Sequence, residues 1–197
     1  MNRISFGKKM VAMLFVGIVL ISAAVFCAAA SKKSGQNSPA GSQEVILTNE
    51  DYFPVLLQTI DEAQNEIFIS MFSFKTNERK NSYPDRILSH LAQAARRGVK
   101  IYVILETTDN KSDELNIQNR QTGKLLEEKG IHVFFDSPRK TTHTKLVVID
   151  QRLLLLGSHN FTQSALKYNN EISILLDSPD MAGNARNYML KIIKEAK

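Results

Sequence analysis

The chain has 197 residues and a single cysteine, Cys27, so length favours one domain and no disulfide can link two parts of the chain. Its formal net charge is +5, but residues 1–30 account for +3 because they contain three basic and no acidic side chains. The remainder is nearly neutral at +2. This excludes an argument for nucleic-acid binding from bulk charge and leaves only local basic clusters to support it.

The first 30 residues have a basic start followed by an uncharged stretch from residue 10 to residue 30. Small residues at 28–30 suit a signal peptidase, which would leave Ser31 as the mature N-terminus. The same stretch is long enough to span a bilayer as an uncleaved anchor, and a buried helix is the third interpretation. Both of the first two interpretations place the rest of the chain outside the cytoplasm. Residues 31–43 are rich in Ser, Gly and polar side chains, which predicts a linker.

From residue 44 onward, apolar segments of strand length alternate with segments that have a helical apolar stripe. Pro84 is placed to open one helix and Gly98 to end it. Residues 106–121 are polar and carry no clear pattern. The predicted strands are 44–47, 66–72, 99–105 and 131–135, and the predicted helices are 52–64, 84–97 and 123–129.

Two further strands are predicted at 143–149 and 152–156, with a tight turn at Asp150-Gln151 between them. A short turn or helix at 161–167, a strand at 171–176 and a helix from about Pro179 follow. The run from Leu146 to Ile149 is apolar throughout, which is typical of a strand covered on both faces. The alternation predicts an α/β sandwich with a central mixed sheet flanked by helices, occupying residues 44–197.

Polar side chains gather at the ends of this predicted strand pair. His143 and Lys145 are two residues apart, so they project from the same face of an extended segment. Ser158 and Asn160 follow the second strand in a polar turn. Because polar tips on a buried sheet are a common place for a site, these residues form the candidate site.

The segment 143–160 matches the pattern H-x-K-x4-D-x6-G-S-x-N at every fixed position, including Asp150 and Gly157. This pattern resembles the signature of the phospholipase D superfamily. The carboxylate that these proteins carry about eleven residues after the asparagine also has a match, Glu171. Over residues 44–197 the chain resembles the short bacterial nuclease branch with one motif per chain, and also a mitochondrial member tethered to a membrane.

The resemblance implies a phosphodiesterase that forms a phosphohistidine on His143 and uses neither a metal nor a cofactor. It also implies a homodimer with one site on its two-fold axis, because one histidine cannot be nucleophile and acid in the same step. Lys145 and Asn160 would hold phosphate oxygens, with Ser158 as a further donor. Glu171 would orient an imidazole from one of the two protomers. Asp150 belongs to the catalytic motif, where we expect it to brace the site.

Basic residues outside the pattern allow two interpretations. Arg139 and Lys140 precede the motif and would line a groove for a polyanion or form a solvated loop. Arg120 and Lys124 carry the same ambiguity. Among the other histidines, we expect structural roles for His90 and His132, and for His159 a position in solvent or behind the site.

The motif predicts that the substrate contains a phosphodiester, but it does not identify the groups that the phosphate joins. We expect an endonuclease of low sequence specificity acting on DNA or RNA. The alternative enzyme is a phospholipase D that hydrolyses phosphatidylcholine or cardiolipin, with the N-terminal segment keeping it beside a membrane. A non-catalytic module that binds nucleic acid is the third hypothesis.

Overall fold

The computed structural model describes residues 44–76 and 81–196. The predicted leader (1–30) and linker (31–43) lie outside the described residues. Within the described residues, no helix combines the length and the apolar character needed to cross a membrane.

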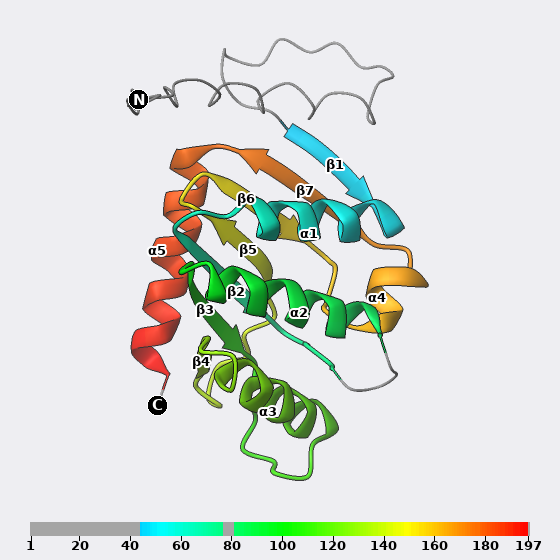
Figure 1. Cartoon of the computed structure of the whole chain (residues 1–197). Coiled ribbons are helices and arrows are strands. Elements are labelled where there is room, and N and C mark those ends of the chain that lie inside the picture. The colour runs from blue at the N-terminus through cyan, green and yellow to red at the C-terminus, as the bar shows by residue number, and fades with distance from the viewer. Residues whose placement is uncertain (1–43, 77–80, 197) are drawn as a thin grey trace, which may run out of the picture. The chain divides into compact units, whose positions relative to one another are not determined.

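A seven-stranded sheet in the order β1-β7-β6-β5-β2-β3-β4 forms the centre of the fold (Figure 1). The neighbours β2–β3 and β3–β4 are parallel, and all other neighbouring strands are antiparallel. The predicted α/β architecture with a mixed sheet is therefore confirmed. The strands are β1 (Glu44–Thr48), β2 (Glu66–Met71), β3 (Lys100–Leu105), β4 (His132–Phe135), β5 (Lys145–Ile149), β6 (Leu153–Gly157) and β7 (Ile172–Asp177).

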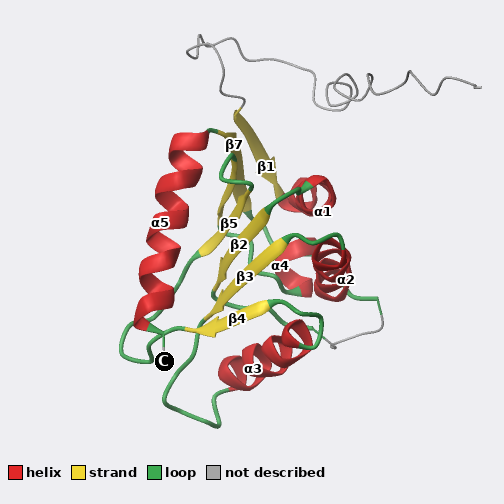
Figure 2. Cartoon of the chain, turned by 60° about the vertical axis from the view of Figure 1, so that its left-hand side comes forward, coloured by secondary structure: helices red, strands yellow, loops and turns green. Residues whose placement is uncertain are grey.

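Helices cover both faces of the sheet (Figure 2). α5 packs on one face over a core that includes Phe68 and Val148, and α1 and α2 pack on the other face over the larger core. All five residues of β5 are buried, as predicted for a strand covered on both sides. The helices are α1 (Tyr52–Glu62), α2 (Tyr83–Arg96), α3 (Glu114–Glu127), α4 (Gln163–Lys167) and α5 (Pro179–Glu195), with a 3-10 turn, η1, at Asn49–Asp51.

Helix α3 begins nine residues earlier than the predicted helix at 123–129. Its N-cap is Asp113, whose side chain accepts a hydrogen bond from the N–H of Asn116. The inward face carries polar residues instead of an apolar stripe. Asn119, for example, is fully buried and bonds the N–H of Phe74 and the carbonyls of Phe72 and Glu106. An apolar pattern could not identify a helix whose buried face is polar.

Strand directions decide where the candidate residues lie. β5 runs antiparallel to β2, with Lys145 opposite Met71, so the amino end of β5 meets the carboxyl ends of β2 and β3. The carboxyl end of β6 likewise meets the amino end of β7, with Gly157 opposite Ser173. The segments around His143 and Glu171 therefore lie at one edge of the sheet, together with the turn that follows β6.

Candidate active site

His143 and Lys145 meet at this edge, one exposed and the other buried. His143 lies just before β5 with an exposed side chain, whereas Lys145 is 8% exposed. Lys145 Nζ lies 3.2 Å from Nε2 of His143 and also donates to the His143 carbonyl at 3.2 Å. An ammonium can only donate, so a hydrogen bond between these two atoms requires the tautomer in which Nε2 accepts and Nδ1 carries the proton. The two side chains share one side of the strand, as their spacing predicts.

Phe72, which follows β2, packs against both of these side chains. Its ring meets the His143 imidazole edge-on at a centroid distance of 4.5 Å and lies 4.9 Å from Lys145 Nζ. Burial lowers the pKa of Lys145, and the negative charge of Glu171 partly opposes that effect. The cation is thus partly removed from water, where it attracts an anion more strongly than an exposed lysine does. Sequence reasoning missed Phe72 because it reads only as the end of an apolar strand.

Ser158 and Glu171 are bonded to each other. Ser158 Oγ donates to Glu171 Oε2, and Asn169 Nδ2 donates to Glu171 Oε1 at 3.0 Å. The N–H of Ile172 donates to Ser158 Oγ at 3.1 Å, which fixes the hydroxyl between the two strands. The hydrogen bonds that the Glu171 side chain makes within the chain do not include His143.

Asn160 has bonding capacity that the fold leaves unused. Its Oδ1 is the one buried side-chain oxygen or nitrogen without a hydrogen-bond partner in the part of the chain that the structure describes. Such an atom is costly in a folded protein unless something else bonds it. The next residue, Phe161, is tied to the segment after β2 through its N–H and the carbonyl of Ser73. This bond holds the backbone beside Asn160, whose side-chain oxygen keeps a free acceptor.

The turn after β6 owes its position to Gly157 and His159. A Cβ on Gly157 would overlap the Ser173 hydroxyl and the Ile172 carbonyl, so only glycine permits this approach to β7. His159 is fully buried, stacks on Tyr52, and bonds Ser173 Oγ at 2.7 Å and the Asn49 carbonyl at 3.0 Å. Of the two positions expected for His159, the structure shows the one behind the site, where the ring fixes the turn. Burial lowers the pKa of His159, which favours the neutral ring.

Asp150 lies at the opposite end of β5 from Lys145, five residues or about 16 Å away along the strand. Its Oδ2 accepts the N–H of Gln64 at 2.8 Å, and its Oδ1 accepts the N–H groups of Asn65 and Glu66 at 2.7 and 2.9 Å. Its φ of 51° and that of Gln151, 52°, form the predicted tight turn. The structure therefore corrects its place among the catalytic residues. Asp150 holds the α1–β2 connection and does not approach the reacting groups.

A pair of buried carboxyl groups, Glu106 and Asp136, supports the backbone beside His143. The N–H of Thr142 donates to Glu106 Oε2 at 2.5 Å and to Asp136 Oδ2 at 3.0 Å, and Asp136 Oδ1 accepts the N–H of Thr107 at 2.8 Å. Burial, together with the hydrogen bond and the charge of Asp136, raises the pKa of Glu106 to about 7. Sequence reasoning missed this pair because each member stands alone in a polar stretch.

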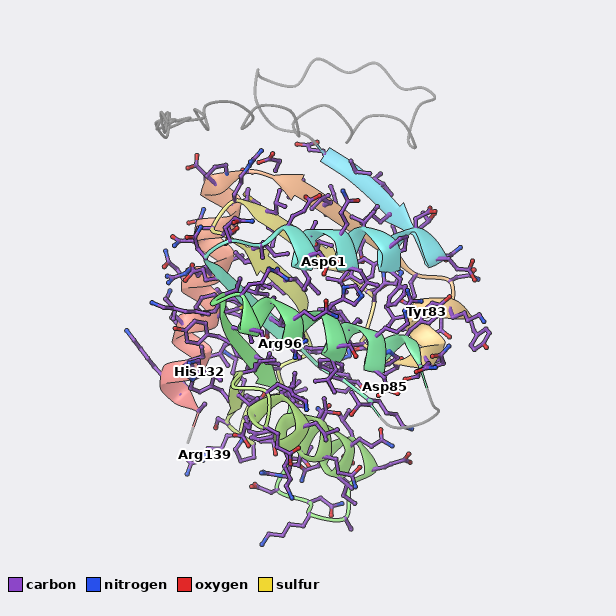
Figure 3. All side chains as sticks on the ribbon, in the orientation of Figure 1. Asp61, Tyr83, Asp85, Arg96, His132 and Arg139 are labelled. Atoms are coloured by element: carbon purple, nitrogen blue, oxygen red, sulfur yellow. The ribbon has the colours of Figure 1, made fainter. Side chains whose placement is uncertain are left out.

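The remaining predicted residues lie apart from the His143–Lys145 pair. Arg139 and Lys140 are exposed in the loop between β4 and β5, and Arg139 projects from the surface (Figure 3). His90 pairs with Asp61 at 2.7 Å, and His132 stacks on Tyr102, so both are structural. Among the described residues, no three His, Cys, Asp or Glu side chains gather in a way that could hold a metal ion.

Comparison with known proteins yields one family. Residues 56–193 match the family described as "Cardiolipin synthase, PLD-like domain". The chain is 28% identical over 127 residues to phospholipase D of Rickettsia prowazekii, which covers 64% of this chain and 55% of that protein. It is 26% identical over 124 residues to polyphosphate kinase of Vibrio parahaemolyticus, covering 59% of this chain and 17% of that protein. The chain thus spans about half of the first relative and a small part of the second.

A solved structure has the same fold. The phospholipase D family member Nuc from Salmonella typhimurium superposes with a TM-score of 0.67 at 19% identity, covering 80% of this chain and 97% of that chain. At this identity the likeness establishes the fold alone. The family match extends over more than half of the sequence and includes the complete motif. The chain therefore belongs to the phospholipase D superfamily.

Proposed function

We propose that this protein is a metal-independent phosphodiesterase, and more specifically an endonuclease of low sequence specificity on DNA or RNA. The observation that carries the proposal is the pair formed by His143 Nε2 and Lys145 Nζ, 3.2 Å apart. It places an unprotonated nitrogen beside a partly desolvated cation on an open edge. A nucleophile next to a charge that stabilises the attacked phosphate is the minimum that such a reaction needs.

In the first step, Nε2 of His143 attacks phosphorus, so that a P–N bond forms as the P–O bond to the leaving alcohol breaks. A second imidazolium donates its proton to the leaving oxygen. In the second step this imidazole takes a proton from water, the hydroxide attacks phosphorus, and the P–N bond breaks. Lys145 would stabilise the charge on the phosphate oxygens. The free acceptor of Asn160 would receive a hydrogen from the entering group, or the amide would turn its N–H toward an oxygen.

The second imidazole would come from another copy of the chain. His143 is exposed at the edge, while His159, the other histidine at this end of the sheet, is buried with both ring nitrogens hydrogen-bonded. An exposed apolar sheet face adjoins the site and suits a second copy, because Ile46, Leu156 and Ile172 are 66, 45 and 57% exposed. We therefore propose a homodimer with the site at its two-fold axis, placed outside the cytoplasm by residues 1–30.

Phospholipid hydrolysis is the second candidate function. It is favoured by the relative named phospholipase D and by the apolar side chains beside the site. The exposed basic residues Arg139 and Lys140 would attract the phosphates of a nucleic acid or those of a phospholipid surface, so they do not favour one substrate over the other. A non-catalytic nucleic-acid-binding module would leave the unused acceptor of Asn160 without a purpose.

The deciding experiment uses the purified chain in excess EDTA, with plasmid DNA, single-stranded DNA, and vesicles of phosphatidylcholine or cardiolipin. His143→Ala runs beside it, and light scattering measures the mass of the assembly. We expect DNA cleavage that persists in EDTA, is lost in the variant, and comes from a dimer. Release of lipid head groups while DNA stays intact would show that the substrate is a phospholipid and not a nucleic acid. DNA binding without turnover of either substrate would favour the binding module.

A further inference from the structure

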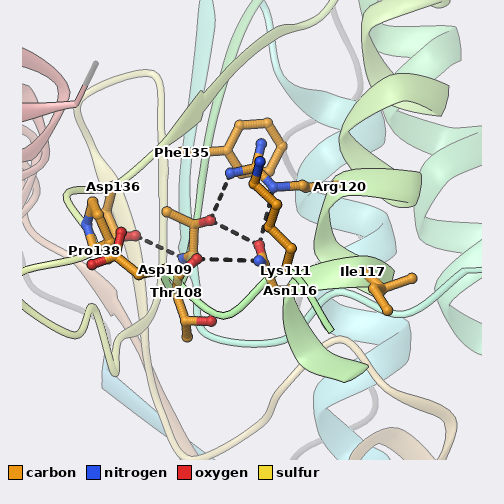
Figure 4. Close-up of a pocket in the computed structure, with 10 residues that line it drawn as sticks. Thr108, Asp109, Lys111, Asn116, Ile117, Arg120, Phe135, Asp136 and Pro138 are labelled. Carbon is orange, nitrogen blue, oxygen red and sulfur yellow. Dashed lines mark hydrogen bonds between the residues drawn. The ribbon is translucent and has the colours of Figure 1, made fainter. Parts of the chain in front are cut away.

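A cavity of about 560 Å³ is lined by residues outside the His143–Lys145 pair (Figure 4). It lies at the carboxyl ends of β3 and β4 and is walled by the start of α3. Its volume is typical of pockets for small ligands or single groups of a larger one. The residues that line it include Thr107, Lys111, Arg120, Phe135 and Asp136, and none of His143, Lys145 and Asn160 is among them.

The cavity adjoins His143 through one side chain. Asp136 lines the cavity, and its Oδ2 accepts the N–H of Thr142, the residue before His143, at 3.0 Å. The cavity and His143 therefore lie at the same end of the sheet, linked by this one hydrogen bond. The arrangement is what a subsite for the neighbouring part of a substrate requires.

Arg120 forms a fixed planar surface on one wall. Its guanidinium carbon lies 4.7 Å from the centre of the Phe135 ring, Nε donates to Asn116 Oδ1 at 3.0 Å, and Nη2 donates to Thr107 Oγ1 at 2.9 Å. Gly123 allows Phe135 to lie against α3, because a Cβ there would come within 2.7 Å of the ring. The guanidinium is thus held in place before any ligand arrives, which lowers the entropy lost on stacking.

The chemistry of the lining favours a nucleotide. Guanidinium planes stack well on nucleobases. Lys111 makes no hydrogen bond or ion pair in the part of the chain that is described, so its ammonium is available for a phosphate. Asp109 offers an acceptor for ring N–H or amino groups. The lining holds two basic side chains, Lys111 and Arg120, and two acidic ones, Asp109 and Asp136, so the choice of ligand rests on the guanidinium plane and not on net charge.

We propose that this cavity receives the nucleoside next to the scissile phosphate, with its base stacked on Arg120 and a flanking phosphate near Lys111. This inference rests on the proposed phosphodiesterase function and names its substrate more closely. A base in a duplex is already stacked and paired, so it must leave the helix before it can enter. The protein therefore prefers single-stranded nucleic acid.

The test compares Arg120→Gln with Lys124→Gln, a matched control that removes the same charge one turn further along α3, outside the residues that line the cavity. Three substrates are used: a single-stranded oligonucleotide, its duplex, and bis(p-nitrophenyl) phosphate, which has a phosphodiester but no nucleoside. For the native chain we expect the single strand to be cut faster than the duplex. Arg120→Gln should lower the preference for the oligonucleotide over bis(p-nitrophenyl) phosphate about tenfold, the effect of losing one stacked base. Lys124→Gln should keep the native preference.

Calorimetry on the His143→Ala chain tests the cavity without turnover. We expect AMP to bind more tightly than ribose 5-phosphate, and Arg120→Gln to remove that difference. Equal affinities for the two ligands, or equal effects of Arg120→Gln and Lys124→Gln, would overturn the nucleoside subsite. A weaker affinity for phospholipid vesicles in Arg120→Gln, with AMP unbound, would assign the cavity to a lipid. If the native chain does not hydrolyse bis(p-nitrophenyl) phosphate, the proposed phosphodiesterase function is wrong. The AMP measurement would still decide whether the cavity binds a nucleoside.

Discussion

Polar motif residues lie at both ends of strand β5, but they differ in how fully the protein itself satisfies their hydrogen-bonding groups. At one end, Asp150 accepts three backbone N–H groups, so its carboxylate is satisfied by the protein itself. At the other end, His143 is exposed, Lys145 is buried beside it, and Asn160 has an oxygen without a partner. A motif residue whose bonds are complete serves the fold, whereas one whose bonds are incomplete is available to a substrate.

The largest expected effect is a loss of activity from a substitution at the end of β5 that carries His143 and Lys145. Lys145→Met should lower the turnover of bis(p-nitrophenyl) phosphate by about 10²–10³-fold, because the cation beside the phosphate is lost. The thermal midpoint should stay the same or rise, since a buried ammonium no longer has to leave water on folding. Steady-state kinetics and calorimetric melting measure the two quantities.

The control for this substitution is Lys129→Met, which removes an exposed lysine beyond the end of α3. Activity retained in Lys145→Met, together with a lower midpoint, would show that Lys145 is structural and would cancel the contrast between the two ends.

The next largest effect is a loss of stability from a substitution at the opposite end of β5, at Asp150. Asp150→Gly removes the carboxylate while tolerating the positive φ of 51°, so the loss reports hydrogen bonds and not backbone strain. We expect unfolding to require about 2 kcal/mol less, because the N–H groups of the α1–β2 connection lose a charged acceptor. Urea titration measures this.

Asp150→Asn is the matched variant, since it keeps one acceptor and also tolerates this conformation. It should lose less stability than Asp150→Gly. The folded fraction of either variant should keep the native turnover number, and a thousandfold lower value at full folding would return Asp150 to the catalytic residues.

The smallest expected effect is a change in the pH dependence of stability at Glu106. This residue lies near His143, but its carboxyl group, like that of Asp150, is hydrogen-bonded within the protein. Its pKa is raised from 4.5 to about 7 by burial and by Asp136, with Asp113 adding to the negative charge. Between these pH values the folded chain holds the proton and the unfolded chain does not. The stabilising contribution is therefore complete below about pH 4.5 and falls as the pH rises to about 7.

Glu106→Gln cannot ionise and can still accept from Thr142, so its stability should change less over this pH range, by a difference on the order of 1–2 kcal/mol. Urea titrations at several pH values measure the slope. Glu127→Gln, an exposed change on α3, should keep the native slope. Equal slopes in all three proteins would mean that the pKa of Glu106 is not raised in the folded chain.

Sequence patterns predicted much of the fold, since apolar periodicity marks any element with an apolar buried face. The run from Leu146 to Ile149 is one example. They failed on α3, where Asn119 and its neighbours bury hydrogen-bonding groups, and periodicity of apolar residues does not register such a face. At the site, two-residue spacing predicted that His143 and Lys145 project from the same face, and the structure brings their side chains into contact. No local pattern could have predicted Phe72 or the Glu106–Asp136 pair, whose partners are distant in sequence.

The amino-acid sequence by itself determined the alternation of strands and helices and the residues of the motif, because these depend on residue type and local spacing. Only the tertiary structure decided that Asp150 holds the α1–β2 connection, that Glu171 bonds Ser158, and that Arg120 lines a cavity at the carboxyl ends of β3 and β4. Those outcomes depend on which strand ends meet at one edge of the sheet, and strand order is set by contacts between segments far apart in the chain.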